Sequence, residues 1–461
     1  MNYREFLNGK RLSTTAYGFE VGEGEINSGL FTWQARIVRW ALVRGRTALF
    51  EDCGLGKTLQ QLEWARHIWQ HTDGMILLLT PLAVGKQTLR EHNRFSINAP
   101  ARMATCQDDC EPGINVANYE KLHLFDASKF NAVVLDESQI LKSYTGATKR
   151  ALIDNFRTTP YRLACTATPA PNDRMELGNH AEFLGIMPAN EMLARWFINE
   201  GKNCGHYRLR KHATRDFWSW IASWAVCISK PSDLGFPDDG FSLPPLNVHE
   251  HIIDSRPAAG WLFAAGGVSA VCVHAEKRSC LPERADKVAD LVNSDSDQWA
   301  VWCDTDYEAD ALRDRIPDAV EVRGSHTDKI KEDRLGGFQD GTHRIIITKP
   351  EIGGLGLNWQ HAHKTTWFAG YSYEKFYQAI RRLWRYGQKL PVECHVVMSE
   401  VEQSIADVVR RKQSEHDEMK SEMAEAMKEF QIANICGAGM KLAPYTPNRK
   451  VMVPDWLLNR T

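Results

Sequence analysis

The sequence predicts an α/β fold in which two tandem lobes each contain a mostly parallel β-sheet with helices on both faces. Three observations predict this class: short apolar runs alternate with helical stretches, polar motifs follow the runs, and a proline-rich segment divides the chain. Apolar runs rich in β-branched residues are typical of buried parallel strands, and helices between them build an open α/β sheet. The runs lie at 75–81, 132–138, 161–169, 299–304, 344–348 and 392–398.

The composition is typical of a soluble globular protein. The chain has 461 residues, 43% of them hydrophobic and 25% charged, which suits roughly two to four domains. No apolar run is long enough to span a membrane, and the N-terminal residues lack the apolar core of a secretory signal. The eleven cysteines form no CxxC pair, so we expect free thiols in a reducing cytoplasm and no zinc site. A net charge of −2 argues against a protein that coats nucleic acid non-specifically.

Prolines and glycines between 230 and 247 make a long element there unlikely to form and predict an interlobe linker. We expect an N-terminal extension (1–29), a first lobe (30–230), the linker (231–249), a second lobe (250–436) and a tail (437–461). Within the first lobe, 189–226 is read as a helical insertion with an aromatic core, and base stacking by these aromatics is the alternative. Residues 401–430 have apolar side chains at helical spacing, which predicts a long amphipathic helix covering the second sheet.

A candidate phosphate-binding loop occupies residues 51–58, which read EDCGLGKT. It follows the apolar segment 48–50 and precedes an amphipathic helical stretch, which is the strand, turn and helix context that such loops need. Gly54 and Gly56 allow the backbone to turn its amides inward, where they and the helix N-terminus attract phosphate. Glu51 replaces the first glycine of the general pattern, so a glycine-rich turn before a helix is the alternative.

Four side chains fit the chemistry of ATP hydrolysis. Lys57 can reach the β- and γ-phosphates, and Thr58 can ligate magnesium. Asp136 and Glu137 end a very apolar strand; the first would hold the metal and the second would orient and deprotonate the attacking water. Taken without the loop, this acidic pair would be read first as a helix cap or a solvated turn; beside the loop, the catalytic reading is favoured.

Three further residues complete a possible site. Gln34 can donate to and accept from the adenine edge at once, which selects ATP. Arg382 and Arg385 are three residues apart, so they share a helix face and can stabilise charge on a γ-phosphate. The alternatives are a surface glutamine and, because Arg381 adds a third charge, a nucleic-acid patch or a salt-bridged surface.

In this order the motifs resemble a superfamily 2 helicase, and most closely its Swi/Snf-like branch. Residues 30–34 resemble the adenine-reading motif, and 51–58 resemble that branch's DEMGLGKT loop. The remaining matches are 77–95 (motif Ia), 113–122 (Ib), 136–139 (the DExx box), 166–169 (III), 348–360 (V) and 378–388 (VI). Together they span residues 30 to 405.

The sequence departs from this branch at four positions. Gln139 stands where the branch has histidine, and Cys53 stands where it has methionine. Arg381 and Trp384 replace an acidic residue and a histidine of motif VI. The compact form resembles helicases carried by bacteriophages and prophages, which implies the cytoplasm of a bacterial or phage-infected cell.

The resemblance implies two RecA-like lobes with an ATP cleft between them and Mg²⁺ beside the nucleotide. Implied ATP contacts are Gln34, Asp52, Cys53, Gly54, Leu55, Gly56, Lys57 and Thr58. Implied catalytic residues are Lys57, Asp136, Glu137, Arg382 and Arg385, and magnesium would be held by Thr58 and Asp136. Implied nucleic-acid contacts are Thr80, Asn118 and Thr348, and the residues expected to couple the two sites are Thr166, Thr168, Gly356 and Gln378.

The function implied is an ATP-dependent motor, a translocase or helicase, on duplex DNA. One alternative is an RNA helicase of the DEAD-box kind, against which the DESQ box and motif V argue. A second is a helicase-like ATPase subunit that loads or recruits partners, through the C-terminal tail, in a restriction, defence or phage replication complex. A membrane partner is not expected.

Overall fold

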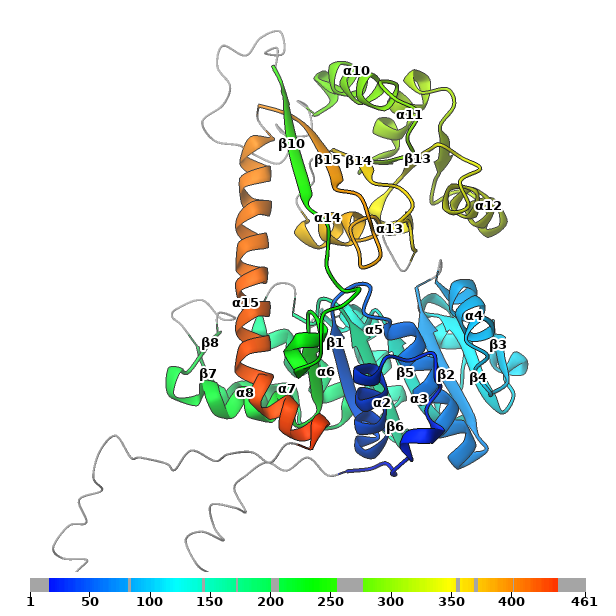
Figure 1. Cartoon of the computed structure of the whole chain (residues 1–461), viewed down its shortest axis with the longest axis vertical. Helices are drawn as coiled ribbons and strands as arrows, with labels where there is room; N and C mark the ends of the chain where they lie inside the picture. The colour runs from blue at the N-terminus through cyan, green and yellow to red at the C-terminus, as the bar shows by residue number, and fades with distance from the viewer. Residues whose placement is uncertain are drawn as a thin grey trace, which may run out of the picture.

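The computed structural model describes residues 16–81, 84–142, 146–170, 173–199, 207–254, 277–353, 357–368, 372–400 and 402–437. They form two α/β lobes, each built on its own sheet, with one long helix running beside both (Figure 1). All strand pairs within the two large sheets are parallel. The predicted class of two tandem, mostly parallel α/β lobes is therefore confirmed.

The first lobe contains a seven-stranded sheet in the order β3-β4-β2-β5-β6-β1-β9. Its strands are β1 (Arg46–Glu51), β2 (Met75–Thr80), β3 (Ala101–Met103), β4 (Gly113–Asn118), β5 (Phe130–Asp136), β6 (Tyr161–Thr166) and β9 (Ala225–Ile228). Its helices are α2 (Thr32–Arg44), α3 (Lys57–Thr72), α4 (Gly85–Arg94), α5 (Ala147–Asn155), α6 (Leu177–Leu184), α7 (Ala189–Trp196) and α8 (Thr214–Ala222).

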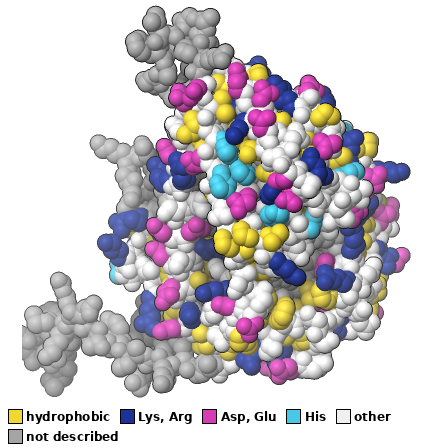
Figure 2. Space-filling view, turned by 45° about the horizontal axis from the view of Figure 1, so that its top comes forward, with side chains coloured by type: hydrophobic (Ala, Val, Ile, Leu, Met, Phe, Trp, Pro, Cys, Tyr) yellow, Lys and Arg dark blue, Asp and Glu magenta, His cyan; other side chains and the backbone are white. Residues whose placement is uncertain are grey.

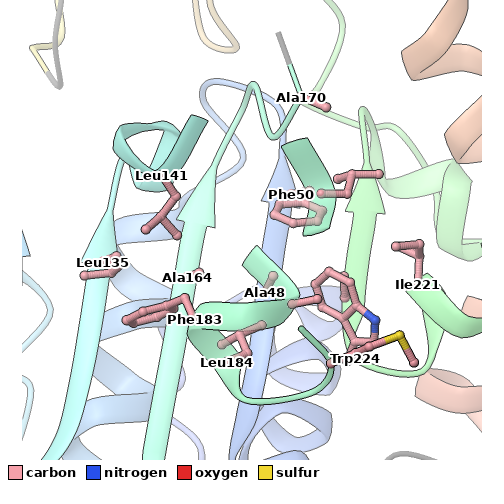
Figure 3. Close-up of a cluster of buried hydrophobic side chains, with 14 of the residues drawn as sticks. Ala48, Phe50, Leu135, Leu141, Ala164, Ala170, Phe183, Leu184, Ile221 and Trp224 are labelled. Atoms are coloured by element: carbon pink, nitrogen blue, oxygen red, sulfur yellow. The ribbon is translucent and has the colours of Figure 1, made fainter. Parts of the chain in front are cut away.

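Both faces of this first sheet are covered. Side chains alternate across each strand, so that Leu135 of β5 packs into one apolar cluster while Val134 packs into another on the opposite face. Figure 3 shows the first cluster, in which Phe183 and Leu184 of α6 lie over the strands. Strands buried on both faces read as continuous apolar runs, which is why the sequence reveals them.

The second lobe contains a six-stranded sheet in the order β10-β15-β14-β11-β13-β12. Its strands are β10 (Leu246–Ile253), β11 (Trp299–Trp302), β12 (Val320–Val322), β13 (Ile345–Thr348), β14 (Lys364–Phe368) and β15 (Val392–Ser399). Its helices are α10 (Leu281–Val292), α11 (Asp306–Arg315), α12 (Asp328–Gln339), α13 (Pro350–Gly353) and α14 (Tyr373–Ile380). All six runs predicted as strands are present, and β10 begins inside the stretch expected to be linker.

The aromatic stretch 189–226 is not wholly helical. It forms α7, a short antiparallel pair of β7 (Phe197–Asn199) and β8 (Tyr207–Leu209), α8, and then the start of edge strand β9. The aromatic side chains are buried, and the rings of Trp196 and Trp220 stack with centroids 4.6 Å apart. Their interpretation as a core, rather than as a base-stacking surface, is confirmed.

The long helix α15 (Gln403–Cys436) forms as predicted, but the expectation that it covers the second sheet is wrong for its C-terminal half. Met423, Met427 and Phe430 pack into the core of the first lobe, against α8 and β9. The side chain of Gln431 accepts a hydrogen bond from the backbone N–H of Cys227 at 2.5 Å. An exposed strand edge needs cover, and α15 provides it for β9. Among the described residues no helix has the length and apolar character needed to cross a membrane.

Candidate nucleotide site between the lobes

The candidate phosphate loop connects β1 to α3, which begins at Lys57. Gly54 and Gly56 have φ of 88° and 81°, the left-handed region that favours glycine. A Cβ atom on Gly56 would lie 2.4 Å from Nε2 of Gln34, and one on Gly54 would lie 3.1 Å from the ring of Tyr386. Both glycines are therefore required by conformation and by close neighbours, and the loop faces the N-terminal, positive end of α3.

Gln34 joins α2 to this loop. Its Oε1 accepts from the backbone N–H of Phe31 at 2.9 Å, and its Nε2 donates to the carbonyl of Leu55 at 2.7 Å. The exposed ring of Phe31 meets Phe241 at 5.2 Å, and Phe241 in turn meets Tyr386 at 5.4 Å. The predicted adenine-reading glutamine thus lies beside an aromatic wall built from both lobes.

Lys57 folds back over the end of β1, where its Nζ donates to the carbonyls of Glu51 at 2.8 Å and Asp52 at 3.1 Å. Glu51 is completely buried; one carboxylate oxygen accepts from Gln60 at 2.7 Å, and the other has no hydrogen-bond partner. Burial raises the pKa of Glu51 to about 7, although Lys57 and Gln60 oppose the change. A proton-sensitive carboxyl group therefore lies directly behind the loop, a feature that the sequence did not reveal.

The acidic pair follows β5. Asp136 is buried and accepts from Nε2 of Gln61 at 2.8 Å. Burial raises its pKa, while Gln61, Lys57 and Arg382 act in the opposite direction. Glu137 has a φ of 53°, a strained backbone conformation of the kind that clusters at functional sites.

The oxygen donors fit a magnesium ion. Mg²⁺ prefers hard oxygen ligands such as carboxylates and hydroxyls, which Asp136 and Thr58 supply. The raised pKa of Asp136 reports that burial of its charge is not fully compensated by its protein neighbours. A bound cation would supply the missing compensation.

The DESQ box and the motif at 166–169 are joined through Gln139. Thr166 donates its hydroxyl to Oε1 of Gln139 at 2.7 Å, and Thr168 donates to the same atom at 3.4 Å. The preceding Ser138 contacts His180 at 3.1 Å. The predicted coupling residues Thr166 and Thr168 are thus in direct contact with the acidic box, through one of the residues that departs from the family pattern.

The second lobe contributes arginines to the same cleft. The expectation that Arg382 and Arg385 share a helix face is corrected, because α14 ends at Ile380 and both residues lie on the turn that follows. They nevertheless converge: both donate to the carbonyl of Leu357, at 3.1 and 3.4 Å. Burial, and then the charge of Arg382, lower the pKa of Arg385 to about 10. Arg382 is near enough to Asp136 to lower that residue's pKa.

Asp52 is the point at which three parts of the chain meet. Its carboxylate lies 2.9 Å from Arg381 and 2.9 Å from Lys420, and it accepts from the hydroxyl of Tyr377 at 2.6 Å and from the N–H of Cys53 at 2.6 Å. Burial alone would raise the pKa of Asp52, but Arg381 and Lys420 hold it well below its ordinary value. Arg381 also donates to the carbonyl of Cys53 at 3.0 Å.

The residues expected to touch nucleic acid are less accessible. Thr80 and Asn118 are register partners at the ends of β2 and β4, and both are buried. Thr348 is buried as well, and its hydroxyl donates to the carbonyl of Val322 at 3.2 Å. Direct phosphate contacts by these three side chains would require local rearrangement.

Of the two remaining coupling residues, Gln378 is buried, and its carbonyl accepts from Arg382 at 3.2 Å; Gly356 lies outside the described residues. Figure 2 shows basic and acidic side chains interspersed over one face of the molecule, with no broad field of either sign. This mixture of charges on one face agrees with the near-neutral net charge of −2.

Three contacts of the site were missed by sequence reasoning. Gln61 has only a helical position beside the loop as its signal, and Tyr377 precedes the predicted arginines without a distinguishing pattern. Lys420 lies in a charged helix beyond every motif, so nothing local connects it with Asp52. Arg381 had a signal, since it was a departure from the family pattern.

Comparisons with known proteins give one family-model match, one curated relative and a match to a solved structure. Residues 33–211 match the SNF2-related domain. A Bos taurus protein named SWI/SNF-related matrix-associated actin-dependent regulator of chromatin subfamily A-like protein 1 is 25% identical over 210 residues, which is 43% of this chain. The match spans only 21% of that relative's length. The solved Sulfolobus solfataricus SWI2/SNF2 ATPase core in complex with dsDNA is 16% identical, with 92% of this chain and 100% of that chain covered and a TM-score of 0.42.

Proposed function

We propose, from the premise that this chain carries an SNF2-related domain and belongs with the Swi/Snf-like branch of superfamily 2, that it hydrolyses ATP to move along duplex DNA. The observation that carries the proposal is the convergence of both lobes on the phosphate loop. Arg381 of the second lobe lies 2.9 Å from Asp52 and donates to the carbonyl of Cys53 at 3.0 Å, and Lys57 of the first lobe and Arg382 of the second both act to lower the pKa of Asp136. A site completed by two lobes makes hydrolysis depend on their approach, which is what a motor requires.

In the proposed reaction, the loop amides and Lys57 bind the β- and γ-phosphates, and Gln34 reads the adenine. Glu137 orients a water molecule and accepts its proton as the water oxygen bonds to the γ-phosphorus and the bond to the leaving ADP oxygen breaks. Thr58 and Asp136 would hold Mg²⁺, which neutralises phosphate charge when bound.

The two converging arginines stabilise the charge that develops on the transferred phosphoryl group. Because Arg382 and Arg385 belong to the second lobe, their contact with the nucleotide is made only in the closed cleft. Release of the products breaks this contact, so the two lobes move apart and change their positions along the DNA. Thr166 and Thr168 are hydrogen-bonded to Gln139 of the DESQ box. Through these contacts, hydrolysis of ATP in the first lobe can affect the residues that bind DNA.

Duplex DNA is favoured over RNA by the family of the matched domain and by the chromatin regulator among the relatives. The setting we expect for this motor is the cytoplasm of a bacterial or phage-infected cell. A helicase-like subunit that recruits partners through residues 437–461 is the second candidate.

The proposal is tested by measuring ATP hydrolysis alone, with duplex DNA, with single-stranded DNA and with RNA. We expect duplex DNA to raise turnover severalfold and Lys57→Ala to abolish it, since the loop then loses its phosphate-binding charge. Stimulation by RNA alone would select the RNA helicase instead. Full turnover by Lys57→Ala would place hydrolysis at another site.

A further inference from the structure

We propose that the C-terminal helix α15 is a working part of the nucleotide site, and that Lys420 is a positioning residue for the phosphate loop. The inference rests on the proposed function only in taking this loop as the place where ATP binds. It adds a residue from outside every helicase motif and outside residues 33–211.

The contact runs from Lys420 through Asp52 to the loop backbone. Nζ of Lys420 lies 2.9 Å from Oδ2 of Asp52, and the two side chains are only 14% and 12% exposed. The other oxygen of Asp52 accepts from the N–H of Cys53 at 2.6 Å, at the peptide where the loop begins its turn. Lys420 therefore positions the carboxylate of Asp52, and this carboxylate accepts the hydrogen bond from the backbone N–H of Cys53 in the loop.

The neighbours of Asp52 belong to different lobes. Tyr377 and Arg381 lie on α14 and the turn after it, so they move with the second lobe. Lys420 is anchored to the first lobe, because Met419 before it and Met423 after it pack into that lobe's core, and its Nζ also donates to the hydroxyl of Tyr377 in the second lobe at 3.3 Å. A salt bridge between Arg174 and Glu422 adds a second tie to the first lobe.

This division of partners gives Lys420 a distinct role. When the lobes separate, Asp52 loses Tyr377 and Arg381 but retains Lys420. Without Lys420, the carboxylate would then keep only the N–H of Cys53 among these partners and could turn away from the loop. Lys420 keeps Asp52 ionised and in place, so that the loop of the open site stays shaped for nucleotide.

Arg381, a departure from the family pattern, is one of the residues around Asp52. The branch has an acidic residue where this chain has Arg381. An acidic residue here would face Asp52 within ion-pair distance and repel it, whereas Arg381 attracts it at 2.9 Å. Arg381 and Lys420 together therefore form a cationic pocket for a carboxylate that this chain carries beside its loop.

The test compares Lys420→Met with Lys428→Met, a control on the exposed side of the same helix. Binding of a fluorescent, non-hydrolysable ATP analogue is measured alongside KM and kcat. We expect Lys420→Met to weaken analogue binding and raise KM about tenfold, as for loss of one charged hydrogen bond, with kcat changed far less. Lys420→Arg should restore most of the binding, and Lys428→Met should bind like the wild type.

Equal loss in Lys420→Met and Lys428→Met, or unchanged analogue binding in Lys420→Met, would overturn the inference. Should Lys420→Met fail to fold, Lys420→Gln replaces it, and it is also measured in an Asp52→Asn background. Because the contact acts through Asp52, the Lys420→Gln effect should vanish there; an undiminished effect counts against the contact. Wild-type protein that binds no analogue would refute the proposed function rather than this contact.

Discussion

Glu51→Gln should remove a loss of stability that the wild-type chain suffers as the pH rises from about 4.5 through about 7. The carboxyl group is fully buried and one of its oxygens has no partner, so its pKa rises from 4.5 to about 7. The folded state therefore binds a proton that the unfolded state releases between these values. Stability from Glu51 is complete below pH 4.5 and is lost as the pH rises through about 7.

The magnitude follows from the same two pKa values. At about 1.4 kcal/mol for each tenfold change in an equilibrium constant, the difference corresponds to about 3 kcal/mol in full. Most of it should appear between pH 5 and pH 8. The glutamine keeps the side-chain oxygen that accepts from Gln60 but cannot ionise, so its protein should lack this component.

The measurement is urea unfolding of the full-length protein, without nucleotide, at several pH values from 5 to 8. It is made for the wild type, for Glu51→Gln and for the exposed control Glu20→Gln. The free energy of unfolding of Glu51→Gln, minus that of the wild type, should increase steadily as the pH rises. The same difference for Glu20→Gln should stay constant with pH. Parallel profiles for all three proteins would refute the reasoning and mean that Glu51 is hydrated or paired in solution.

Two further variants probe the cleft. Glu137→Gln should bind ATP normally but hydrolyse it at least about 100-fold more slowly, because the amide cannot accept the proton of the attacking water; near-normal turnover in a phosphate-release assay would remove Glu137 from that role. Arg381→Asp should separate the lobes, since breaking a buried ion pair costs about 3–5 kcal/mol and the new carboxylate would repel Asp52. The radius of gyration from small-angle X-ray scattering should rise, and an unchanged radius at low salt would show that Asp52 does not hold the lobes together.

The parts of the fold that were predictable share one physical property. Strands buried on both faces must be apolar along their whole length, so β5 and β13 stand out in the sequence without any knowledge of their partners. Edge strands carry no such requirement. Strand β10, with mostly exposed side chains, reads as part of the linker, and β9 is hidden within an aromatic stretch.

The residues of the candidate site also fall into those that could be predicted from the sequence and those that could not. Its local parts, Gly54, Gly56 and Lys57, are readable because a phosphate loop needs specific residues at neighbouring positions. Lys420 could not be predicted, because its partner Asp52 lies far away along the chain and nothing in a charged helix distinguishes one lysine among several.

By itself, the sequence predicted the two α/β lobes, the candidate phosphate loop and the candidate acidic pair, since each prediction depends on residues close together along the chain. Only the tertiary structure decided which surface α15 covers and which charges surround Asp52. Tyr377 and Asp52 are 325 residues apart and meet through a hydrogen bond of 2.6 Å. Contacts of that kind depend on how two finished lobes pack, and the energy that selects them comes from burial and charge pairing across the cleft.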